Sequence, residues 1–446
     1  MREMERVLVL GAGLVARPLV RYLLDQGYEV RVASRTLAKA EALIAGHPRG
    51  EARQLDVADT AALEGLVREA DLVISLLPYV HHVAVATICI KHRKDMVTTS
   101  YVSAAMRALD GEAKDAGIII LNEIGLDPGI DHMEAMRLID DVHDKGGKVV
   151  SFYSYCGGLP APEANTNPFG YKFSWSPRGV LLAMKNPARY LKDGKEVSIP
   201  AEELFDHYWT VEIEGLGEFE AYPNRDSIPY IETYGIPETE AMYRGTLRNL
   251  GWCATWKKLI ELGLLDEEER DLRGLTWADL LRRLIGSPGE GDLKRELAAH
   301  LGLAEDSEVL GKLEWLNILS DEPLPLERGS PLDLLTVRLQ EKLRYEEGER
   351  DMIVLQHELI ATYPDTGRKE KITSTLVDFG IPGGDTAMAR TVGLPAAIGA
   401  KLILRGELKL KGIQIPVVPE IYKPVLAELE TQGIKFKEVR EALETS

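Results

Sequence analysis

The chain has 446 residues, and its 45% hydrophobic and 7% aromatic content supplies the cores of two or three domains and excludes a disordered chain. Asp and Glu outnumber Lys and Arg by 71 to 53, and a net charge of -18 disfavours nucleic acid and anionic membranes as partners. The three cysteines, Cys89, Cys156 and Cys253, form no C-x-x-C pair, which excludes a disulfide scaffold and a thiolate zinc site.

The ends and the apolar runs of the chain predict a cytoplasmic protein. The apolar run at Val7 to Leu10 is too short for the core of a signal peptide, and no stretch approaches transmembrane length. His81 and His82 are adjacent, so they cannot share a helix face as a chelating pair does. We expect them on the surface where a helix begins, and we expect no metal site.

The first 125 residues alternate short apolar runs with amphipathic stretches, which is typical of a parallel sheet with crossover helices. A helical pattern follows the first strand, and Gly27 stands where a helix end needs glycine. Six strands in this rhythm predict a complete Rossmann-type, doubly wound sheet. The expected strands are residues 7–10, 29–33, 53–57, 72–77, 95–99 and 118–121.

Beyond this sheet the pattern changes twice. Gly-Pro-aromatic segments and alternating stretches such as Trp209 to Ile213 predict an antiparallel or mixed sheet, with further strands at 352–356 and 372–379. Leucines at helical spacing from Leu247 to about Gln340 predict an all-helical insertion, and a long helix is expected from Thr386 to Leu404.

We therefore predict an α/β protein in which a Rossmann domain precedes an α+β mixed-sheet domain that carries a helical insertion. The Rossmann domain takes residues 1–125 and binds NADP(H), with 386–446 packing back on it. The substrate and dimerisation domain takes 126–246 and 350–385, and the insertion takes 247–349.

The strongest motif is G-x-G-x-x-A at Gly11 to Ala16, directly after a strand and directly before a helix. Gly11 permits the tight turn, Gly13 lets the backbone approach a pyrophosphate, and the small Ala16 lets the helix pack closely on the sheet. We expect Gly11, Gly13, Leu14 and Val15 to bind a dinucleotide. The alternative is a glycine turn in a nucleotide-free α/β protein.

The end of the second strand favours NADP(H) over NAD(H). NAD-specific sheets place a carboxylate there for the ribose 2′-hydroxyl, whereas this strand ends in Ser34, Arg35 and Thr36. A guanidinium and two hydroxyls bind a 2′-phosphate instead. The alternative is that Arg35 is a solvated loop residue.

Later strand ends supply the other expected contacts. Asp56 and Val57 are placed to meet the adenine, although Asp56 could equally cap a helix. The residues expected along the nicotinamide-ribose crevice are Ser75, Leu76, Leu77, Thr99 and Ser100.

Polar side chains also follow the fifth and sixth strands. Ser100 and Tyr101 offer hydroxyls, and Asp127 offers a carboxylate where a nicotinamide is expected. The alternatives are that Ser100 or Ser103 caps the next helix and that Asp127 caps a helix beginning near Gly129. Cys156 precedes a Gly-Gly-Leu-Pro turn, although most buried cysteines serve only in packing.

Taken together, these segments resemble the saccharopine dehydrogenases of the L-glutamate-forming type, also called saccharopine reductases. The resemblance spans about residues 7 to 400, and its substrate-side strings are more specific than the glycine motif. The matching strings are GAGLVARPL, ASRT, SLLPY, TTSYVS, NEIGLDPGIDH, SYCGGLPAPE, NPFGYKFSWSPRG, NRDS, RGTLRNLGW and TAMARTVGLPAA.

The resemblance implies NADP(H)-dependent hydride transfer at the imine that joins L-2-aminoadipate 6-semialdehyde to L-glutamate, in the aminoadipate route of lysine biosynthesis. It implies that saccharopine is bound by Ser100, Tyr101, Asp127, Arg225 and Thr246, with Arg225 as a bidentate carboxylate clamp. Asp127, Cys156 and Tyr101 are the candidates for proton transfer, with Cys156 also near the substrate. Gly125, Leu126 and Ser176 are expected near the nicotinamide or the substrate.

The same resemblance implies a homodimer that acts on small molecules: saccharopine, glutamate and aminoadipate semialdehyde. Since no lysine-ketoglutarate reductase region precedes the first strand, we expect a stand-alone enzyme of the biosynthetic type. Two alternatives stay open. One is a reductase for a different amine and semialdehyde, like carboxynorspermidine synthase, and the other is a non-catalytic NADPH-binding regulator.

Overall fold

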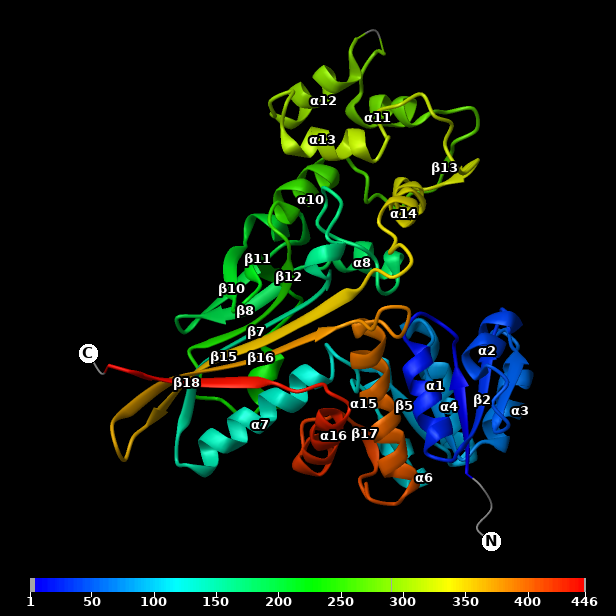
Figure 1. Cartoon of the computed structure of the whole chain (residues 1–446), viewed down its shortest axis with the longest axis vertical. Helices are drawn as coiled ribbons and strands as arrows, with labels where there is room; N and C mark the ends of the chain where they lie inside the picture. The colour runs from blue at the N-terminus through cyan, green and yellow to red at the C-terminus, as the bar shows by residue number, and fades with distance from the viewer. Residues whose placement is uncertain (1–4, 290, 445–446) are drawn as a thin grey trace. The chain divides into compact units, whose positions relative to one another are not determined.

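A computed structural model describes residues 5–289 and 291–444 (Figure 1). The chain divides into two compact units. Unit 1 comprises Met1–Val150, Glu232–Glu238 and Leu355–Ser446, and unit 2 comprises Ser151–Ile231 and Thr239–Val354. The predicted boundary at residue 125 falls inside unit 1, because the helix that follows the sixth strand belongs to that unit.

Unit 1 contains the expected Rossmann-type sheet. Its strands follow the order β17-β6-β5-β4-β1-β2-β3, and every neighbouring pair is parallel. The sequence predicted six of these strands, and the seventh, β17, pairs with β6 from near the other end of the chain. The bounds are β1 Arg6–Leu10, β2 Glu29–Ser34, β3 Gly50–Gln54, β4 Leu72–Ser75, β5 Asp95–Thr98, β6 Ile119–Leu121 and β17 Gly412–Gln414.

The predicted third strand at residues 53–57 is wrong by about three residues. β3 ends at Gln54 because two aspartates bend the chain that follows. Asp56 Oδ1 accepts from the Ala58 amide at 3.0 Å, and Asp59 Oδ1 accepts from the Ala62 amide at 3.0 Å as the cap of helix α3. Aspartate side chains that bond to nearby amides favour turns over strands.

Helices connect and cover the parallel strands. Helix α1 begins at Ala16, and Gly27, as predicted, follows its end with a φ of 97°. The described helices that lie wholly in unit 1 are α1 Ala16–Asp25, α2 Leu37–Ile44, α3 Thr60–Glu69, η1 Tyr79–His81, α4 His82–His92, α5 Ala104–Arg107, α6 Asp110–Ala116, α7 Ile130–Asp144, α15 Ala387–Leu404 and α16 Pro419–Thr431.

The long helix predicted from Thr386 to Leu404 is confirmed as α15, and Thr386 is its cap. Helix α15 packs against α1 (Figure 1). Gly393 permits this approach, because a Cβ there would lie 2.8 Å from the Val15 carbonyl oxygen. With 18 residues and a mean hydropathy of 1.3, α15 is long and apolar enough to cross a membrane, so the expectation that no stretch approaches transmembrane length is wrong. Since 83% of it is buried inside the protein, it is a core helix.

The second large sheet is mixed, as predicted. Its strand order is β10-β11-β12-β7-β15-β16-β18, with β8 pairing with β12 and β9. The β12–β7 pair is parallel, whereas β10–β11, β11–β12 and β16–β18 are antiparallel. The bounds are β7 Lys148–Pro160, β8 Ala188–Lys192, β9 Lys195–Ile199, β10 Trp209–Ile213, β11 Gly217–Pro223, β12 Ala241–Arg248, β15 Asp351–Tyr363, β16 Arg368–Phe379 and β18 Lys437–Leu443.

The expected insertion is mainly helical, but a short two-stranded ribbon, β13 with β14, interrupts it. Two of its helices begin with capping boxes, at Thr276 with Asp279 and at Ser330 with Asp333, which satisfy the first amides. The remaining elements are η2 Pro162–Ala164, α8 Pro177–Ala183, η3 Ala201–Asp206, α9 Pro229–Thr233, α10 Trp252–Glu261, β13 Arg270–Asp271, α11 Trp277–Ile285, α12 Leu293–Leu301, α13 Glu308–Trp315, β14 Arg328–Gly329 and α14 Pro331–Lys342.

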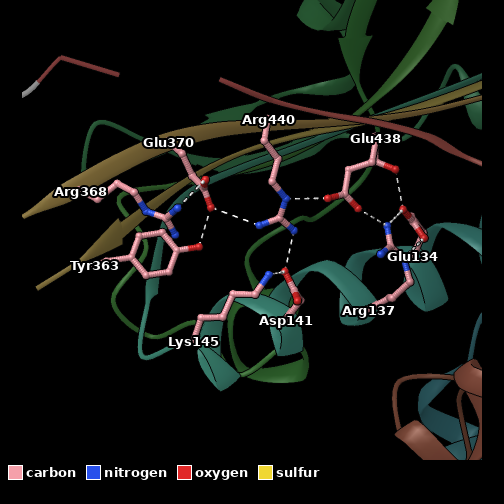
Figure 2. A network of polar contacts seen from close by, with 10 residues as sticks. Glu134, Arg137, Asp141, Lys145, Tyr363, Arg368, Glu370, Glu438 and Arg440 are labelled. Atoms are coloured by element: carbon pink, nitrogen blue, oxygen red, sulfur yellow. Dashed lines mark hydrogen bonds and ion pairs between the residues drawn. The ribbon is translucent and has the colours of Figure 1, made fainter. Parts of the chain in front are cut away.

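A network of charged side chains ties α7 to β16 and β18 within unit 1 (Figure 2). Arg137 donates to the buried Glu134 at 2.6 Å and to Glu438 at 2.7 Å. Arg440 of β18 donates to Glu438 at 2.6 Å and to Asp141 of α7 at 2.6 Å. Ion pairs that share partners cost less side-chain entropy per bond than isolated pairs, so this network anchors the C-terminal strand.

Replacing Arg440 by Gln is expected to lower the free energy of unfolding by about 1–2 kcal/mol, because three carboxylates lose a charged donor. Lys145→Gln is the control. Among the described residues, the Lys145 ammonium pairs with Asp141 alone, and its side chain is 49% exposed, so we expect a loss of under about 0.5 kcal/mol. Urea denaturation at neutral pH measures both, and equal losses would contradict the anchoring role.

The same network predicts the direction of acid sensitivity. Burial opposes ionisation of Asp141 and Glu438, but hydrogen bonds from their cationic partners outweigh it and hold both pKa values below the usual range. A lowered pKa in the folded state adds stability above the unfolded pKa and loses it as the pH falls. Between neutral pH and about pH 3, the wild type should therefore lose more stability than Arg440→Gln.

Candidate active site

The predicted site residues of unit 1 follow strands that end in one row. Leu10 of β1 lies opposite Ala33 of β2 and Ser75 of β4, and Ser75 lies opposite Thr98 of β5. Parallel strands in register carry the loops after them to the same edge of the sheet. The order also reverses at β1, which has β4 on one side and β2 on the other. A ligand is expected where the strand order reverses.

The glycine loop after β1 fits a pyrophosphate. Gly11 has a φ of 109°, and a Cβ there would lie 3.0 Å from the Leu76 carbonyl oxygen. Apart from Gly13 and its two neighbours in the chain, no described residue has a heavy atom within 4 Å of a Cβ built on Gly13, and Leu14 is 64% exposed.

Helix α1 has no side-chain cap and no acidic residue in its first turn. The Ala16 amide donates to the Gly13 carbonyl at 3.2 Å and Pro18 has no amide hydrogen, so the Arg17 amide and the loop before the helix are what its start offers to an anion.

The loop after β2 fits a 2′-phosphate. Ser34 is partly buried, and Arg35 and Thr36 are exposed. Arg35 forms no ion pair with any residue that the structure describes, and its carbonyl accepts from Gln54 Nε2 at 3.2 Å. The alternative that Asp56 caps α3 is wrong, because Asp59 is the cap. Contacts of Asp56 and the partly buried Val57 with adenine stay predictions.

Ser100 does not cap a helix. Ser103 does so, accepting from the Met106 amide at 3.1 Å at the start of α5. The Ser100 hydroxyl instead lies 2.8 Å from His82 Nε2, and His82 Nδ1 lies 2.9 Å from the Ser75 hydroxyl.

His82 was expected on the surface, and that expectation is wrong. The side chain is 4% exposed, and burial lowers the pKa of His82 to about 4. The sequence contained a signal for this burial. His82, Val85, Ala86 and Cys89 are spaced as one helix face, and these are the buried residues of α4.

Asp127 and Tyr101 are brought together, as the hypothesis of a shared site requires. The Tyr101 hydroxyl donates to Asp127 Oδ1 at 2.7 Å. Asp127 does not cap α7, because the residue before the helix is Gly129, whose amide donates to Asp131 Oδ1 at 2.6 Å. The alternative that Asp127 is a helix cap is therefore wrong.

A buried glutamate supports this pair of loops, and the sequence analysis did not single it out. Glu123 has a φ of 56°, and its Oε1 accepts from the Val102 amide at 2.8 Å. Its Oε2 lies 2.8 Å from His132 Nε2, and His132 Nδ1 lies 2.7 Å from the Tyr234 hydroxyl. The loop that carries Ser100 and Tyr101 is thus fixed to the segment that leads to Asp127.

Gly125 makes a second close contact between the loop after β5 and the segment that leads to Asp127. A Cβ on Gly125 would lie 3.1 Å from Thr99 Cβ and 3.2 Å from the Pro128 carbonyl oxygen. Leu126 beside it is buried. A larger residue at position 125 would therefore displace Thr99 or the backbone at Pro128, directly after Asp127.

In unit 2, two predicted site residues lie opposite each other. Cys156 of β7 pairs with Thr246 of β12, which pairs on its other side with Tyr222 of β11. Side chains of paired residues share a face, and positions two apart on a strand share it too. The buried Arg244 and Arg248 therefore lie on the face of Thr246. Neither arginine was predicted from the sequence, although period-two spacing groups both with Thr246.

The last two predicted residues of unit 2 are exposed. Arg225 has a φ of 59°, and its carbonyl accepts from the Arg189 amide at 2.9 Å. Ser176 caps α8 by accepting from the Gly179 amide at 3.2 Å. Substrate contact by Arg225 and nicotinamide contact by Ser176 stay predictions.

Comparisons with known proteins identify the family. Residues 7–121 match the saccharopine dehydrogenase NADP binding domain, and residues 125–434 match the saccharopine dehydrogenase C-terminal domain. The L-glutamate-forming, NADP+ saccharopine dehydrogenase of Pyricularia oryzae is 44% identical over 97% of this chain and 98% of its own length. Its counterpart in Saccharomyces cerevisiae is 44% identical over 97% of this chain and 99% of its own length.

A solved structure agrees with these sequences. The apo form of saccharopine dehydrogenase (L-Glu forming) from Saccharomyces cerevisiae has a TM-score of 0.88 and 43% identity, covering 98% of this chain and all of that one. The mitochondrial alpha-aminoadipic semialdehyde synthase of Bos taurus is 41% identical over 97% of this chain, which spans 47% of that relative. The chain belongs to the saccharopine dehydrogenase family.

Proposed function

We propose that this protein is an NADP(H)-dependent saccharopine dehydrogenase of the L-glutamate-forming type. It interconverts L-saccharopine, NADP+ and water with L-glutamate, L-2-aminoadipate 6-semialdehyde, NADPH and a proton, as a step of lysine biosynthesis. The observation that carries this proposal is the row of strand ends in unit 1. It presents a glycine loop with open space at Gly13, an exposed Arg35 and the Tyr101–Asp127 pair at one edge of the sheet.

The cofactor site divides between two loops. The amides at the start of α1 and the Gly13 backbone bind the pyrophosphate, and Arg35 binds the 2′-phosphate. When bound, NADP+ supplies a hydride acceptor for the carbon beside the secondary amine of saccharopine. The remaining work of the protein is to orient that carbon, to bind carboxylates and to move protons.

The substrate carries three carboxylates, so an acidic protein needs local cations and hydroxyl donors to bind it. Ser100, Thr246 and Arg225 supply them, with the guanidinium of Arg225 suited to a bidentate contact.

Proton transfer precedes and follows loss of the hydride. The secondary ammonium of saccharopine first loses a proton, so that its lone pair can form a protonated imine as the hydride leaves. Water adds to this imine and releases a proton, and the carbinolamine hydroxyl loses another as the C–N bond breaks. The nitrogen of glutamate gains two protons as it leaves, so that one proton is released overall. Asp127 is the group of unit 1 placed to take up and return a proton, because Tyr101 fixes one carboxylate oxygen at 2.7 Å. Cys156, buried on β7 opposite Thr246, is the candidate in unit 2.

The direct test mixes the purified protein with saccharopine and NADP+. We expect NADPH absorbance to rise and glutamate to appear in equal amount, because the reaction forms one of each. Parallel reactions supply NADPH with other amine and semialdehyde pairs. NADPH oxidation with such a pair, together with no turnover of saccharopine, would assign the protein to a different reductase.

Replacing Asp127 by Asn tests the proton-transfer role. We expect kcat to fall by about 100-fold, since general acid–base groups contribute about that much, while the Kd for NADP+ stays the same. Tyr101→Phe removes only the orienting hydroxyl, so its loss of kcat should be smaller. Asp115→Asn, on the exposed side of α6, is the matched control. Losses under about tenfold for Asp127, Tyr101 and Cys156 variants alike would show that positioning carries the rate.

Cofactor choice depends on Arg35. Arg35→Ala should raise the Kd for NADP+ by about tenfold or more and leave the Kd for NAD+ unchanged, because only the 2′-phosphate loses a charged donor. Arg68→Ala, an exposed arginine at the far end of α3, controls for the change in net charge. Titration of protein fluorescence with each nucleotide measures the constants. Equal use of both nucleotides by wild type and Arg35→Ala would contradict the assignment.

A further inference from the structure

One buried histidine in unit 1 contacts three hydroxyl groups at the strand-end row. His82 Nε2 lies 2.8 Å from the Ser100 hydroxyl and 3.2 Å from the Thr98 hydroxyl. His82 Nδ1 lies 2.9 Å from the Ser75 hydroxyl. Ser75, Thr98 and His82 are buried, whereas Ser100 is partly exposed. Ser100 is therefore the member of this cluster that a ligand can reach.

The hydroxyl protons of the buried residues select one tautomer of the ring. Among the described residues, Ser75 has one side-chain hydrogen-bond partner, His82 Nδ1, so its proton has an acceptor only when Nδ1 is unprotonated. A buried hydroxyl proton without an acceptor is unfavourable. In this tautomer Nε2 carries the hydrogen and donates to Ser100, whose own proton faces outward. Among the described residues of the cluster, Thr98 then has the one buried hydroxyl proton without an acceptor.

The other tautomer satisfies fewer groups. With the hydrogen on Nδ1, the Ser75 proton has no acceptor. The Ser100 hydroxyl, at 2.8 Å against 3.2 Å for Thr98, then takes the single lone pair of Nε2, so the buried Thr98 proton lacks an acceptor as well. A ring protonated on both nitrogens would also leave Ser75 without an acceptor. Burial lowers the pKa of His82 to about 4, which keeps the ring neutral near pH 7.

We propose that His82 is a positioning residue for substrate binding, whose Nε2–H donates to the Ser100 hydroxyl oxygen and so directs the Ser100 proton to a carboxylate of saccharopine. The proposal rests on the proposed function, because an anionic ligand needs an outward-facing donor. Reversal of the bond would turn the Ser100 proton toward the ring and present only lone pairs to the carboxylate, which repel it.

Two amide substitutions separate this role from simple packing. The side-chain nitrogen of Gln is three bonds from Cβ, as His Nε2 is, whereas that of Asn is two bonds from Cβ, as His Nδ1 is. His82→Gln therefore keeps a donor for Ser100, and His82→Asn keeps only the contact with Ser75. We expect His82→Gln to retain the KM for saccharopine within about threefold and His82→Asn to raise it about tenfold or more. His81→Asn, next in the chain, is the control.

Three measurements show whether the effect is specific. The Kd for NADP+ and the melting temperature should change to a similar degree in the Gln and Asn variants, because both bury an amide. In a Ser100→Ala background, His82→Asn should add under about threefold to KM, since residues that act through each other are not additive. Equal KM values for the Gln and Asn variants, or a full His82→Asn effect without Ser100, would overturn the proposal.

Failure of the proposed function would be recognised separately. If the wild type binds NADP+ but does not turn over saccharopine, the proposed function fails, and the role in saccharopine binding fails with it. The tautomer on which the proposal depends is tested without substrate by the nitrogen shifts of His82 in histidine-labelled protein. Hydrogen on Nε2 supports the proposal, and hydrogen on Nδ1 overturns it even if the enzyme is active.

Discussion

The hydrogen-bond register of the parallel sheet in unit 1 is the constraint on which the candidate site depends. Leu10, Ala33, Ser75 and Thr98 occupy one row, so the four loops that follow them begin at the same level of the sheet. A one-residue shift of β4 would reverse the face of every side chain in it and separate Ser75 from His82. The glycine loop, the phosphate-binding loop and the hydroxyl cluster are consequences of this register.

The buried polar side chains at and beside this row form hydrogen bonds with one another. Glu123, His132 and Tyr234 form one buried chain of hydrogen bonds, and Ser75, His82 and Ser100 form another. Buried polar groups stabilise a protein little on balance but are costly to leave unpaired, so such chains fix one arrangement. The loops that carry Ser100, Tyr101 and Asp127 are therefore preorganised, which is what hydride and proton transfer require.

The sequence predicted the elements whose signals are local. The glycine turn at Gly11, the end of α1 at Gly27 and the cap of α15 at Thr386 are all found, because short-range sterics and hydrogen bonds determine them. The predicted bounds of β3 were wrong, since Asp56 and Asp59 turn the chain earlier than its apolar pattern indicates. Strand β17 was missed because its three residues, Gly412 to Gln414, include one apolar side chain, whereas the equally short β6 is entirely apolar.

The site shows the same division. Its exposed donors at Gly13 and Arg35 could be named from motifs. His82, Glu123 and His132 act through side chains that the fold brings to them, and the NEIGLDPGIDH string that contains the last two does not indicate those contacts. A complex with NADPH and saccharopine, solved by crystallography, tests the account most directly. We predict pyrophosphate oxygens at the start of α1 and a saccharopine carboxylate oxygen within about 3 Å of the Ser100 hydroxyl. Saccharopine bound away from Ser100 and Asp127, with those loops unchanged, would contradict it.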